Sequence, residues 1–443
     1  MKKLFGTDGI RGEANVWPLT PEIALAVGKA LATTLPQNAT VIIGGDTRRS
    51  RGILENALAA GLAAAGVNVK LGGILPTPAV AAVTRSLNAH AGIVITASHN
   101  PASDNGIKIF SADGYKLDDA QEDKIAWQVL NAATQTGVSW RELGAVSRMD
   151  DAAEVYEKFL ASFVQPDLLR GMTVVVDGAH GAASHVAPKI FRDLGAHVEA
   201  MGDAPDGMNI NDGCGALHPQ KLLARVRETG AAFGVALDGD ADRLVMCDAN
   251  GVADGDMLMA AIAASLDTAG RLAKRTVVVT SMTNLGLHAA LTPRGIRILA
   301  TDVGDRYVIE RMKADGYNFG GENSGHLIFS DFLPTGDGIL AALQIASLMR
   351  GSTLSQWLAQ TGMVLFPQQL VGINVAEKIP LEKLPLLQTV IRDAETDLGA
   401  DGRVVVRYSG TENKIRLLVE ARLEAQVTRW MDALRGAVDK ELL

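Results

Sequence analysis

Short runs of apolar, often β-branched residues alternate along most of the chain with longer stretches whose apolar positions recur at helical spacing. Residues 40–44 (TVIIG), 91–96 (AGIVIT) and 172–176 (MTVVV) are such runs, and a polar or glycine-rich turn follows each of them. Continuous apolar runs of this length are typical of strands that are buried on both faces of a sheet. The pattern therefore predicts α/β layers built from strand–turn–helix units.

The strand–turn–helix pattern begins again near residues 172 and 275, and a different pattern follows residue 368. This last segment has three strand-like runs and two amphipathic helical stretches, at 384–398 and 425–442. We predict three related α/β domains with mixed sheets and a smaller C-terminal α+β domain. The predicted domain ranges are 1–155, 156–254, 255–367 and 368–443.

Composition places the chain among ordinary globular proteins, with 47% hydrophobic and 21% charged residues in a length of 443. Lys and Arg number 42 against 50 Asp and Glu, and the net charge of -8 disfavours a nucleic-acid partner. The Ala-rich stretch 53–67 contains glutamate, asparagine and glycines, which indicates a buried helix and no membrane span. The polar start lacks the apolar core of a signal peptide and there are only two cysteines, so we expect a cytoplasmic protein.

A candidate nucleophile lies in residues 95–101 (ITASHNP), where an apolar run ends and a proline turn begins. A side chain just past a strand end of an α/β sheet faces the usual ligand crevice. Ser98 holds this position, but a serine hydroxyl is a poor nucleophile until a base or a metal assists it. His99 is adjacent and Lys108 lies across the loop. By itself, the segment also suits a turn whose polar side chains bind their own backbone.

Three aspartates alternate in residues 237–243 (LDGDADR), directly after the apolar run 233–237. Asp238, Asp240 and Asp242 can converge on one hard cation, and Mg²⁺ prefers such oxygen ligands. Their mutual repulsion without a cation supports this prediction. A calcium EF-hand loop is excluded, because the glycine and glutamate of its sixth and twelfth positions are missing. A phosphatase with Asp238 as nucleophile and a solvated acidic turn are the alternatives.

Residues 320–326 (GGENSGH) precede another short apolar run. Glu322, Ser324 and His326 alternate, so in an extended segment their side chains share one face. A carboxylate, a hydroxyl and an imidazole on one face suit the hydroxyls or the amine of a sugar. The alternative is a glycine-rich β-turn with satisfied polar groups.

Residues 407–416 (RYSGTENKIR) join two predicted strands. Backbone N–H groups at a glycine turn, two hydroxyls and two arginines can bind an anion, and arginine suits bidentate phosphate recognition. The candidate ligands in this segment are Arg407, Ser409, Gly410, Thr411 and Arg416. A further basic candidate is Arg11 in the glycine-rich start 5–12 (FGTDGIRG), where small neighbours allow close approach to a phosphate. A solvated hairpin and a frayed terminus are the respective alternatives.

These segments, in this order and over essentially the whole length, resemble the α-D-phosphohexomutase superfamily. The resemblance implies four domains around a central active-site cleft, the fourth with a TATA-binding-protein-like fold. FGTDGIRG, SGTE and GENSGH are similar to the subgroup that acts on glucosamine phosphate. The chain departs from the common pattern where Ala241, Tyr408 and Asn413 replace Gly, Lys and Pro.

The resemblance implies a phosphoserine at Ser98 and a Mg²⁺ ion bound by that phosphate and the three aspartates. The basic residues near the transferring phosphate would be Arg11, Lys108 and Arg243. His99, adjacent to Ser98, and Lys108 are the candidate general bases. The residues that bind the sugar and its other phosphate would be Glu322, Ser324, His326, Arg407, Ser409, Gly410, Thr411 and Arg416.

The implied activity is the interconversion of glucosamine 6-phosphate and glucosamine 1-phosphate through a sugar bisphosphate, which also primes the phosphoserine. This reaction would feed UDP-N-acetylglucosamine synthesis and so supply a cell-wall precursor. The expected partner is a small phosphosugar, without nucleic acid or membrane, and the family suggests a homodimer. The alternatives are a glucose- or mannose-phosphate mutase of the same superfamily, a non-catalytic sugar-phosphate sensor and an aspartyl-phosphatase.

Overall fold

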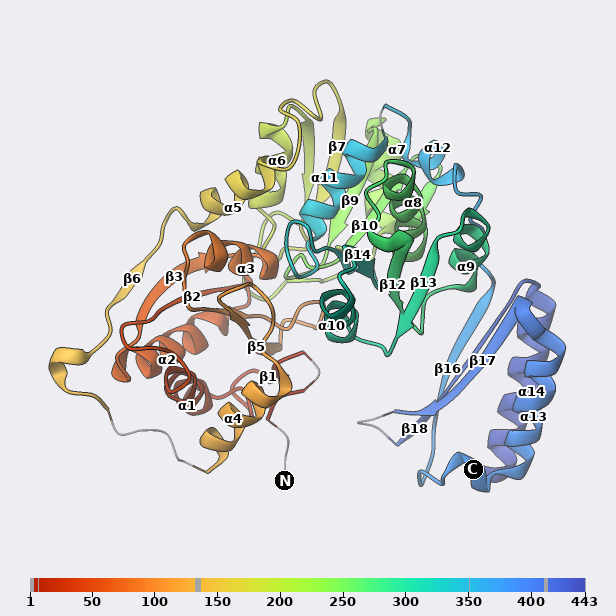
Figure 1. Ribbon diagram of the computed structural model, residues 1–443, viewed down its shortest axis with the longest axis horizontal. Helices are drawn as coiled ribbons and strands as arrows, with labels where there is room; N and C mark the ends of the chain where they lie inside the picture. The colour runs from red at the N-terminus through yellow and green to blue at the C-terminus, as the bar shows by residue number, and fades with distance from the viewer. Residues whose placement is uncertain (1–3, 7, 132–136, 350, 410–412, 443) are drawn as a thin grey trace. The chain divides into compact units, whose positions relative to one another are not determined.

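The computed structural model describes residues 4–6, 8–131, 137–349, 351–409 and 413–442. These residues form two compact units. The main unit contains Met1–Met282 and Gly295–Thr361, and the C-terminal unit contains Thr283–Arg294 and Gly362–Leu443. In the described residues, the main unit holds three sheets and the C-terminal unit holds a fourth (Figure 1).

The first sheet of the main unit is mixed, with the strand order β1-β5-β4-β2-β3-β6. Its strands are β1 (Ile10–Glu13), β2 (Thr40–Gly45), β3 (Asn68–Ile74), β4 (Ala91–Ile95), β5 (Asp104–Ser111) and β6 (Val146–Arg148). The helices that pack on one face are α1 (Pro21–Ala32), α2 (Arg51–Ala64) and α4 (Asp119–Leu130). On the other face lies α3 (Thr77–Ser86) (Figure 1). Because helices cover both faces, β2 and β4 are buried almost throughout.

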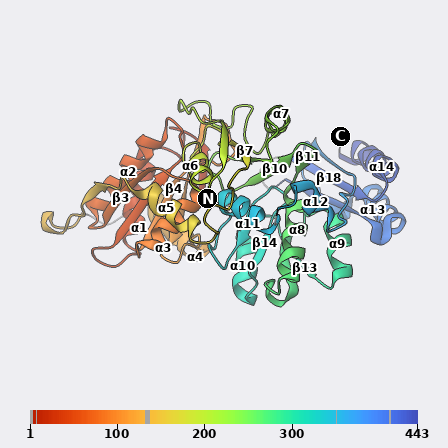
Figure 2. The same ribbon diagram turned by 90° about the horizontal axis from the view of Figure 1, so that it is seen from above.

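The second and third sheets are also mixed, in the orders β11-β10-β9-β7-β8 and β13-β12-β14-β15. Their strands are β7 (Thr173–Asp177), β8 (His197–Met201), β9 (Phe233–Leu237), β10 (Leu244–Asp248), β11 (Gly251–Ala253), β12 (Thr276–Thr280), β13 (Arg297–Thr301), β14 (Phe319–Gly321) and β15 (Leu327–Phe329). The helices of this region are α5 (Ala152–Ala161), α6 (Val186–Asp193), α7 (Gln220–Thr229), α8 (Gly255–Thr268), α10 (Asp305–Asp315), α11 (Gly338–Met349) and α12 (Leu354–Ala359). The two sheets are joined by α11, which packs against β9, β10 and β15 (Figure 2).

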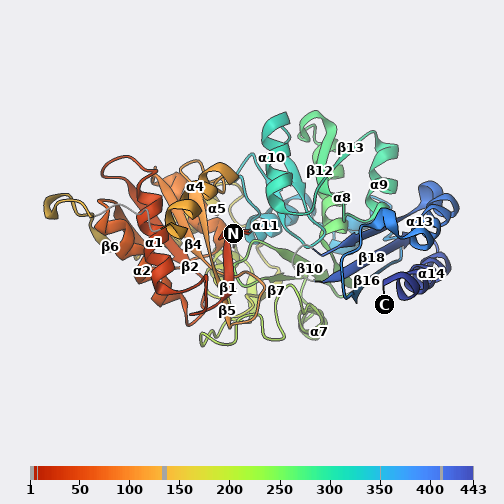
Figure 3. The ribbon, with the colours of Figure 1, turned by 90° about the horizontal axis from the view of Figure 1, so that it is seen from below.

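The C-terminal unit has a three-stranded antiparallel sheet in the order β16-β18-β17. The elements of this unit are β16 (Gln368–Asn374), β17 (Gly402–Tyr408), β18 (Lys414–Ala421), α9 (Leu285–Leu291), α13 (Pro385–Leu398) and α14 (Glu424–Leu442). The last two helices pack against one face of the sheet (Figure 3). Side chains of β16 alternate between exposed and half-buried, as expected for a sheet with one solvated face.

Each sheet carries one candidate motif in the same kind of place, a connection between two antiparallel strands. Ser98 lies between β4 and β5, and the three aspartates lie between β9 and β10. The turn from Glu322 to His326 joins β14 to β15, and the arginine-rich segment joins β17 to β18. The two strands that flank each motif are antiparallel, and these antiparallel pairs contribute to the mixed character of the first three sheets.

The predicted strands at 40–44, 91–96, 172–176 and 233–237 are confirmed to within one residue at each end. The predicted mixed sheets and the smaller C-terminal α+β region are also confirmed. The predicted boundary after residue 155 falls inside the continuous helix α5, and the four domain ranges stay a prediction. Across the described parts of the chain, every helix is too short or too polar to cross a bilayer.

Candidate active site

Ser98 lies just beyond the end of β4 and is 1% exposed. Its hydroxyl donates a hydrogen bond to Oδ2 of Asp238 at 2.6 Å and lies 3.3 Å from Nδ1 of His99. The φ angle of Ser98 is 51°, in the left-handed region that non-glycine residues avoid. Such a conformation costs on the order of 1 kcal/mol, so the surrounding structure has to hold the turn.

Two side chains hold this turn through its backbone. Nη2 of Arg48 donates to the carbonyl oxygen of Ser98 at 3.0 Å, and Nδ2 of Asn211 donates to the same oxygen at 2.9 Å. The buried carboxylate of Asp46 accepts hydrogen bonds from Arg48 Nε and from Thr96 Oγ1. Thr96 Oγ1 in turn accepts the N–H of Ser98 at 2.9 Å. The guanidinium of Arg48 is therefore bound within the protein, where it positions the Ser98 turn.

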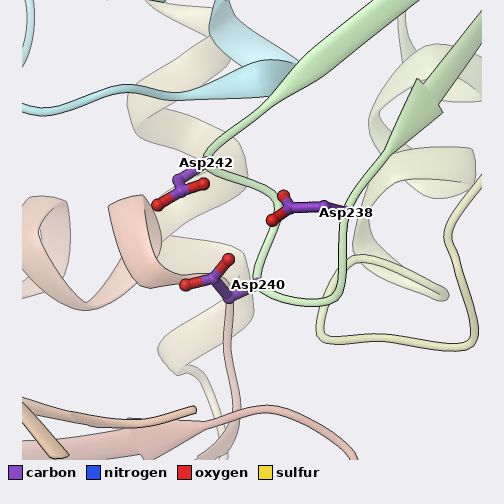
Figure 4. A group of neighbouring side chains, drawn as sticks. All are labelled: Asp238, Asp240 and Asp242. Carbon is purple, nitrogen blue, oxygen red and sulfur yellow. The ribbon is translucent and has the colours of Figure 1, made fainter. Parts of the chain in front are cut away.

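The loop between β9 and β10 brings the three aspartates together, as their alternation predicts (Figure 4). One carboxylate oxygen from each lies within 4.8 Å of the others, and all three residues are buried. Burial, followed by the charges of Asp242 and Asp240, raises the pKa of Asp238 well above its usual value. Three buried acids at this spacing repel one another unless cations offset their charge.

Two of these carboxylates keep an oxygen available for another ligand. Oδ2 of Asp240 accepts a hydrogen bond from Lys108 at 3.0 Å, whereas its Oδ1 is buried and has no hydrogen-bond partner among the described residues. Oδ1 of Asp242 is buried in the same way. A buried carboxylate oxygen without a partner costs free energy, and Mg²⁺ prefers oxygen ligands. The donor set therefore fits a hard divalent cation.

The ammonium group of Lys108 is buried among these carboxylates. Nζ donates its hydrogen bond to Asp240 in the loop between β9 and β10, which we call the metal loop. It also lies 3.1 Å from Asp8 and 3.6 Å from Asp242. Burial lowers the pKa of Lys108, but the three neighbouring carboxylates outweigh burial and raise it above its usual value. Arg11 forms an ion pair with Asp8, and its Nη1 lies 3.4 Å from the carbonyl oxygen of Ala97. Both predicted cations therefore lie at this site.

His99 and Arg243 flank the same carboxylates. Burial and the charges of Arg243 and Arg11 lower the pKa of His99 to about 4. Arg243 donates its backbone N–H to Oδ1 of Asp238 at 3.2 Å, and its Nε lies 3.9 Å from Asp242. The structure thus places both residues beside Ser98 and the aspartates.

The segment from Glu322 to His326 is a tight turn, which is the geometry of the glycine-rich alternative and not that of an extended segment. The N–H of Glu322 donates to the carbonyl oxygen of His326, and the N–H of Gly325 donates to that of Glu322, both at 3.0 Å. Gly325 has a φ of 88°, and a Cβ atom there would lie 2.1 Å from the carbonyl oxygen of Leu244. Only glycine fits this close approach, and the turn that it permits removes the alternation of side chains on one face.

The side chains of this turn meet different partners. His326 is buried, with Nδ1 3.6 Å from Asp242 and Nε2 3.5 Å from Asp305. Burial lowers the pKa of His326, but the charges of Asp242 and Asp305 outweigh it and raise the pKa to about 9. Glu322 accepts a hydrogen bond from a backbone N–H at 3.2 Å, and Oγ of Ser324 is buried with no hydrogen-bond partner in the described chain. His326 therefore belongs to the network of carboxylates around the metal loop.

The predicted phosphate-binding segment lies between β17 and β18 of the C-terminal unit. Arg407 and Arg416 are directly opposite each other on these strands. Like charges in such a cross-strand pair repel, so an anion between them would be stabilising. Ser409 is buried beside this pair, whereas the predicted ligands Gly410 and Thr411 lie outside the described residues.

Lys378 adds a further cation to this segment, and the sequence analysis missed it. Its Nζ donates to the carbonyl oxygen of Ser409 at 2.7 Å. The carbonyl oxygen of the next residue, Ile379, accepts a hydrogen bond from the hydroxyl of Tyr408 at 2.6 Å. Residue 378 lies in the irregular stretch between β16 and α13, where no periodicity or motif marks it.

Family models of known proteins match successive parts of the chain that contain these motifs. Models of the phosphoglucomutase/phosphomannomutase alpha/beta/alpha domains I, II and III and of the C-terminal domain match residues 2–136, 154–251, 254–362 and 370–437. A phosphoglucosamine mutase of Anaeromyxobacter sp. (strain Fw109-5) is 50% identical, over 99% of this chain and 96% of that protein. The chain belongs to the phosphoglucomutase/phosphomannomutase family. The predicted membership of the α-D-phosphohexomutases is thereby confirmed.

A further relative and two solved structures are also similar to this phosphohexomutase over almost its whole length. A phosphoglucosamine mutase of Desulfotalea psychrophila is 48% identical over 98% of each chain. A crystal structure of a phosphoglucomutase/phosphomannomutase family protein from Burkholderia thailandensis has a TM-score of 0.82 at 24% identity, over 100% of this chain and 98% of that one. The N-acetylphosphoglucosamine mutase of Aspergillus fumigatus, in complex with GlcNAc-6P and magnesium, has a TM-score of 0.66 at 18% identity, over 99% and 96%. The two structures show the shared fold.

One group of residues at the site of this phosphohexomutase was not predicted. Nζ of Lys116 donates to Asp8 and to Asp305, both at 2.5 Å, and so links the glycine-rich start to the first turn of α10. Asp8 lies within the FGTDGIRG segment, so the sequence offered a motif by which this residue could have been predicted. Lys116 and Asp305 stand alone in the sequence, and only the fold brings them to the site.

Proposed function

We propose that this protein interconverts glucosamine 6-phosphate and glucosamine 1-phosphate through a phosphoserine at Ser98 and a bisphosphorylated sugar. The observation that carries the proposal is the 2.6 Å hydrogen bond from Ser98 to Asp238, inside a cluster of three buried aspartates. A hydroxyl beside a site for a hard cation suits phosphoryl transfer, where positioning and charge stabilisation supply most of the catalysis. The phosphoglucosamine mutases at 50% and 48% identity support the choice of sugar.

The three aspartates would hold Mg²⁺, with an oxygen of the Ser98 phosphate as a further ligand. The bound cation would offset the negative charge of the transferring phosphoryl group. Lys108 holds the carboxylates through its contacts with Asp8 and the metal loop, and Arg243 holds Asp238 through its backbone N–H. These cations, with Arg11, would keep the pocket near electrical balance when a phosphate enters it.

In the forward direction, the C1 hydroxyl of glucosamine 6-phosphate attacks the phosphorus on Ser98. An O–P bond forms at C1, and the proton of the C1 hydroxyl passes to a base, for which His99 and Lys108 are the candidates. The P–Oγ bond of Ser98 breaks, and Oγ takes up a proton to become a hydroxyl again. After the bisphosphate has reoriented in the site, its C6 phosphate is transferred to Ser98 and glucosamine 1-phosphate leaves. The sugar bisphosphate also primes Ser98 before the first turnover.

The phosphate that is not transferred would bind to Arg407, Ser409 and Arg416, together with the predicted Gly410 and Thr411. The cross-strand pair of arginines supports this role, because an anion between them removes their repulsion. The sugar itself would meet the Glu322–His326 turn. There the Glu322 carboxylate and the Ser324 hydroxyl, which has no hydrogen-bond partner among the described residues, suit an amine and a hydroxyl, and His326 would act by holding Asp242.

We place the reaction in the cytoplasm, because Cys214 and Cys247 are free thiols and suit a reducing compartment. The homodimer that the family suggests stays a prediction. In this setting the product would feed the synthesis of UDP-N-acetylglucosamine.

The deciding experiment compares kcat/KM for glucosamine, glucose and mannose phosphates, each with Mg²⁺ and a trace of the matching bisphosphate. We expect glucosamine phosphate to be strongly preferred, and Ser98→Ala to lose on the order of 10³-fold or more in kcat, because the nucleophile is gone. A preference for glucose or mannose phosphate would overturn the assignment of glucosamine phosphate as the substrate but leave the assignment of Ser98 as the phosphorylated residue intact. An active Ser98→Ala protein, or a base-labile acyl phosphate in place of a phosphoserine, would favour the aspartyl-phosphatase.

A further inference from the structure

We infer that Thr77 is a positioning residue for the metal site, which holds Asp240 with its Oδ1 oxygen turned toward the cation before the cation binds. Thr77 is the first residue of α3, a helix that packs against the first sheet, whereas the aspartates follow a strand of the second sheet. In the sequence, the Leu-Pro-Thr-Pro segment around Thr77 indicates only a turn. The inference rests on the proposed Mg²⁺ site and adds to it a residue that no motif of the sequence indicates.

Two hydrogen bonds attach Thr77 to the metal loop. Its Oγ1 donates to Oδ2 of Asp240 at 2.6 Å, and its N–H donates to the carbonyl oxygen of Asp240 at 2.9 Å. Both residues are completely buried, so no water competes for these contacts. The N–H is one of the donors that a helix leaves unpaired in its first turn, and the positive end of the α3 dipole faces the aspartate. One residue therefore fixes both the backbone and the side chain of Asp240.

The arrangement decides which oxygen of Asp240 is available. Oδ2 receives Thr77 Oγ1 and also Lys108 Nζ, at 3.0 Å, so both of its contacts lie within the protein. Oδ1 is buried and has no hydrogen-bond partner in the described chain. Rotation of the carboxylate would exchange the two oxygens, and the bond from Thr77 opposes this rotation. Hydrogen-bonding partners of metal ligands act in this way, and their loss typically lowers metal affinity about 10- to 100-fold.

The same helix contains a matched control. Thr84 also lies on α3 and is completely buried, but its Oγ1 has no hydrogen-bond partner among the described residues. Thr→Val removes one hydroxyl and keeps the shape at either position. A difference between the two variants therefore reports the bond to Asp240 and not the loss of a buried hydroxyl from α3.

The test measures Mg²⁺ binding directly, by calorimetry on the full-length protein, with phosphorylation of Ser98 matched by intact mass. Mn²⁺ as a spectroscopic substitute gives a second reading. We expect Thr77→Val to weaken Mg²⁺ binding about 10- to 100-fold, Thr77→Ser to restore it, and Thr84→Val to bind as the wild type does. At saturating Mg²⁺, kcat of Thr77→Val should approach the wild-type value, since Thr77 does not touch the reacting groups.

Equal Mg²⁺ affinity in Thr77→Val and the wild type would overturn the inference and leave the proposed mutase activity intact. A lowered Tm with unchanged Mg²⁺ affinity would do the same, since it would show a purely structural contact. If the wild type itself bound no Mg²⁺, the metal assignment would fall and the role of Thr77 with it. Should Thr77→Val not fold, Thr77→Ala against Thr77→Ser gives the same comparison, with the weaker affinity expected in Thr77→Ala.

Discussion

The two regions that we propose to bind phosphate are built in opposite ways. Around Ser98, the three aspartates and Lys108 are buried, and Lys108 pairs with Asp240 and with the half-buried Asp8 within the main unit. Around β17 and β18 of the C-terminal unit, Arg407 is exposed and Arg416 is half-buried. The first region is closed by its own charge pairs, whereas the second presents cations toward solvent.

The difference follows from what each region is proposed to do. A phosphoserine that met water would hydrolyse, so the transferring region has to exclude water and be ordered in advance. The other phosphate only has to be held and released, and cations that face solvent suit this task because solvent limits the repulsion that remains between them when no anion is bound. Substitutions in the buried region should therefore change kcat, and substitutions in the exposed region should change KM.

The largest effect is expected at the buried carboxylates. Asp240→Asn keeps the shape of the side chain but replaces an anionic ligand by a neutral amide, and it removes one of the charges that face Lys108. We expect kcat to fall on the order of 10³-fold, with weaker Mg²⁺ binding. Steady-state kinetics over a series of Mg²⁺ concentrations measure both quantities.

The control for this substitution is Asp248→Asn, on β10 of the same sheet. Asp248 is also buried, but it accepts hydrogen bonds from the N–H and hydroxyl of Ser355, at 2.8 and 2.7 Å. We expect Asp248→Asn to lower Tm and to leave kcat unchanged. Full activity of Asp240→Asn, or an equal loss of kcat in the control, would contradict the proposal that the buried carboxylates around Ser98 determine kcat.

A smaller effect, and on KM, is expected for Arg407→Ala in the C-terminal unit. A hydrogen bond to a charged group contributes about 1.5–3 kcal/mol, so KM should rise about 10- to 100-fold while kcat changes little. Arg422→Ala is the control, because Arg422 is exposed on the same unit and pairs with Asp401 at 3.0 Å. A loss of kcat at unchanged KM would instead assign Arg407 to the transferring step.

The smallest effect is expected from salt. Raising the ionic strength from about 0.1 M to about 1 M shortens the Debye length from about 10 Å to about 3 Å. Exposed arginines should then hold the substrate less strongly, so we expect KM to rise several-fold, while the buried charges and kcat should hardly respond. Initial rates at fixed Mg²⁺ in increasing KCl test this, and a parallel fall of kcat would mean that the transferring region is open to solvent.

The contrast also explains which residues the sequence revealed. Asp238, Asp240 and Asp242 were predicted as a cluster because they share one short loop, and a loop between antiparallel strands keeps its side chains together. The sequence left the Glu322–His326 segment open between an extended strand and a glycine-rich turn, because the conformation at Gly325 depends on contact with Leu244, which is distant in sequence. A pattern of alternating residues predicts a shared face only where the backbone is extended.

By itself, the sequence predicted the α/β layers with mixed sheets, the strands that precede the motifs and the family, because apolar runs and short motifs act over a few neighbouring residues. Only the tertiary structure decided that Thr77, Arg48 and Lys116 serve the site, and which carboxylate oxygens keep room for a cation. Each of these contacts joins residues that are far apart in the chain. Their hydrogen bonds become strong and specific only when folding has buried both partners together.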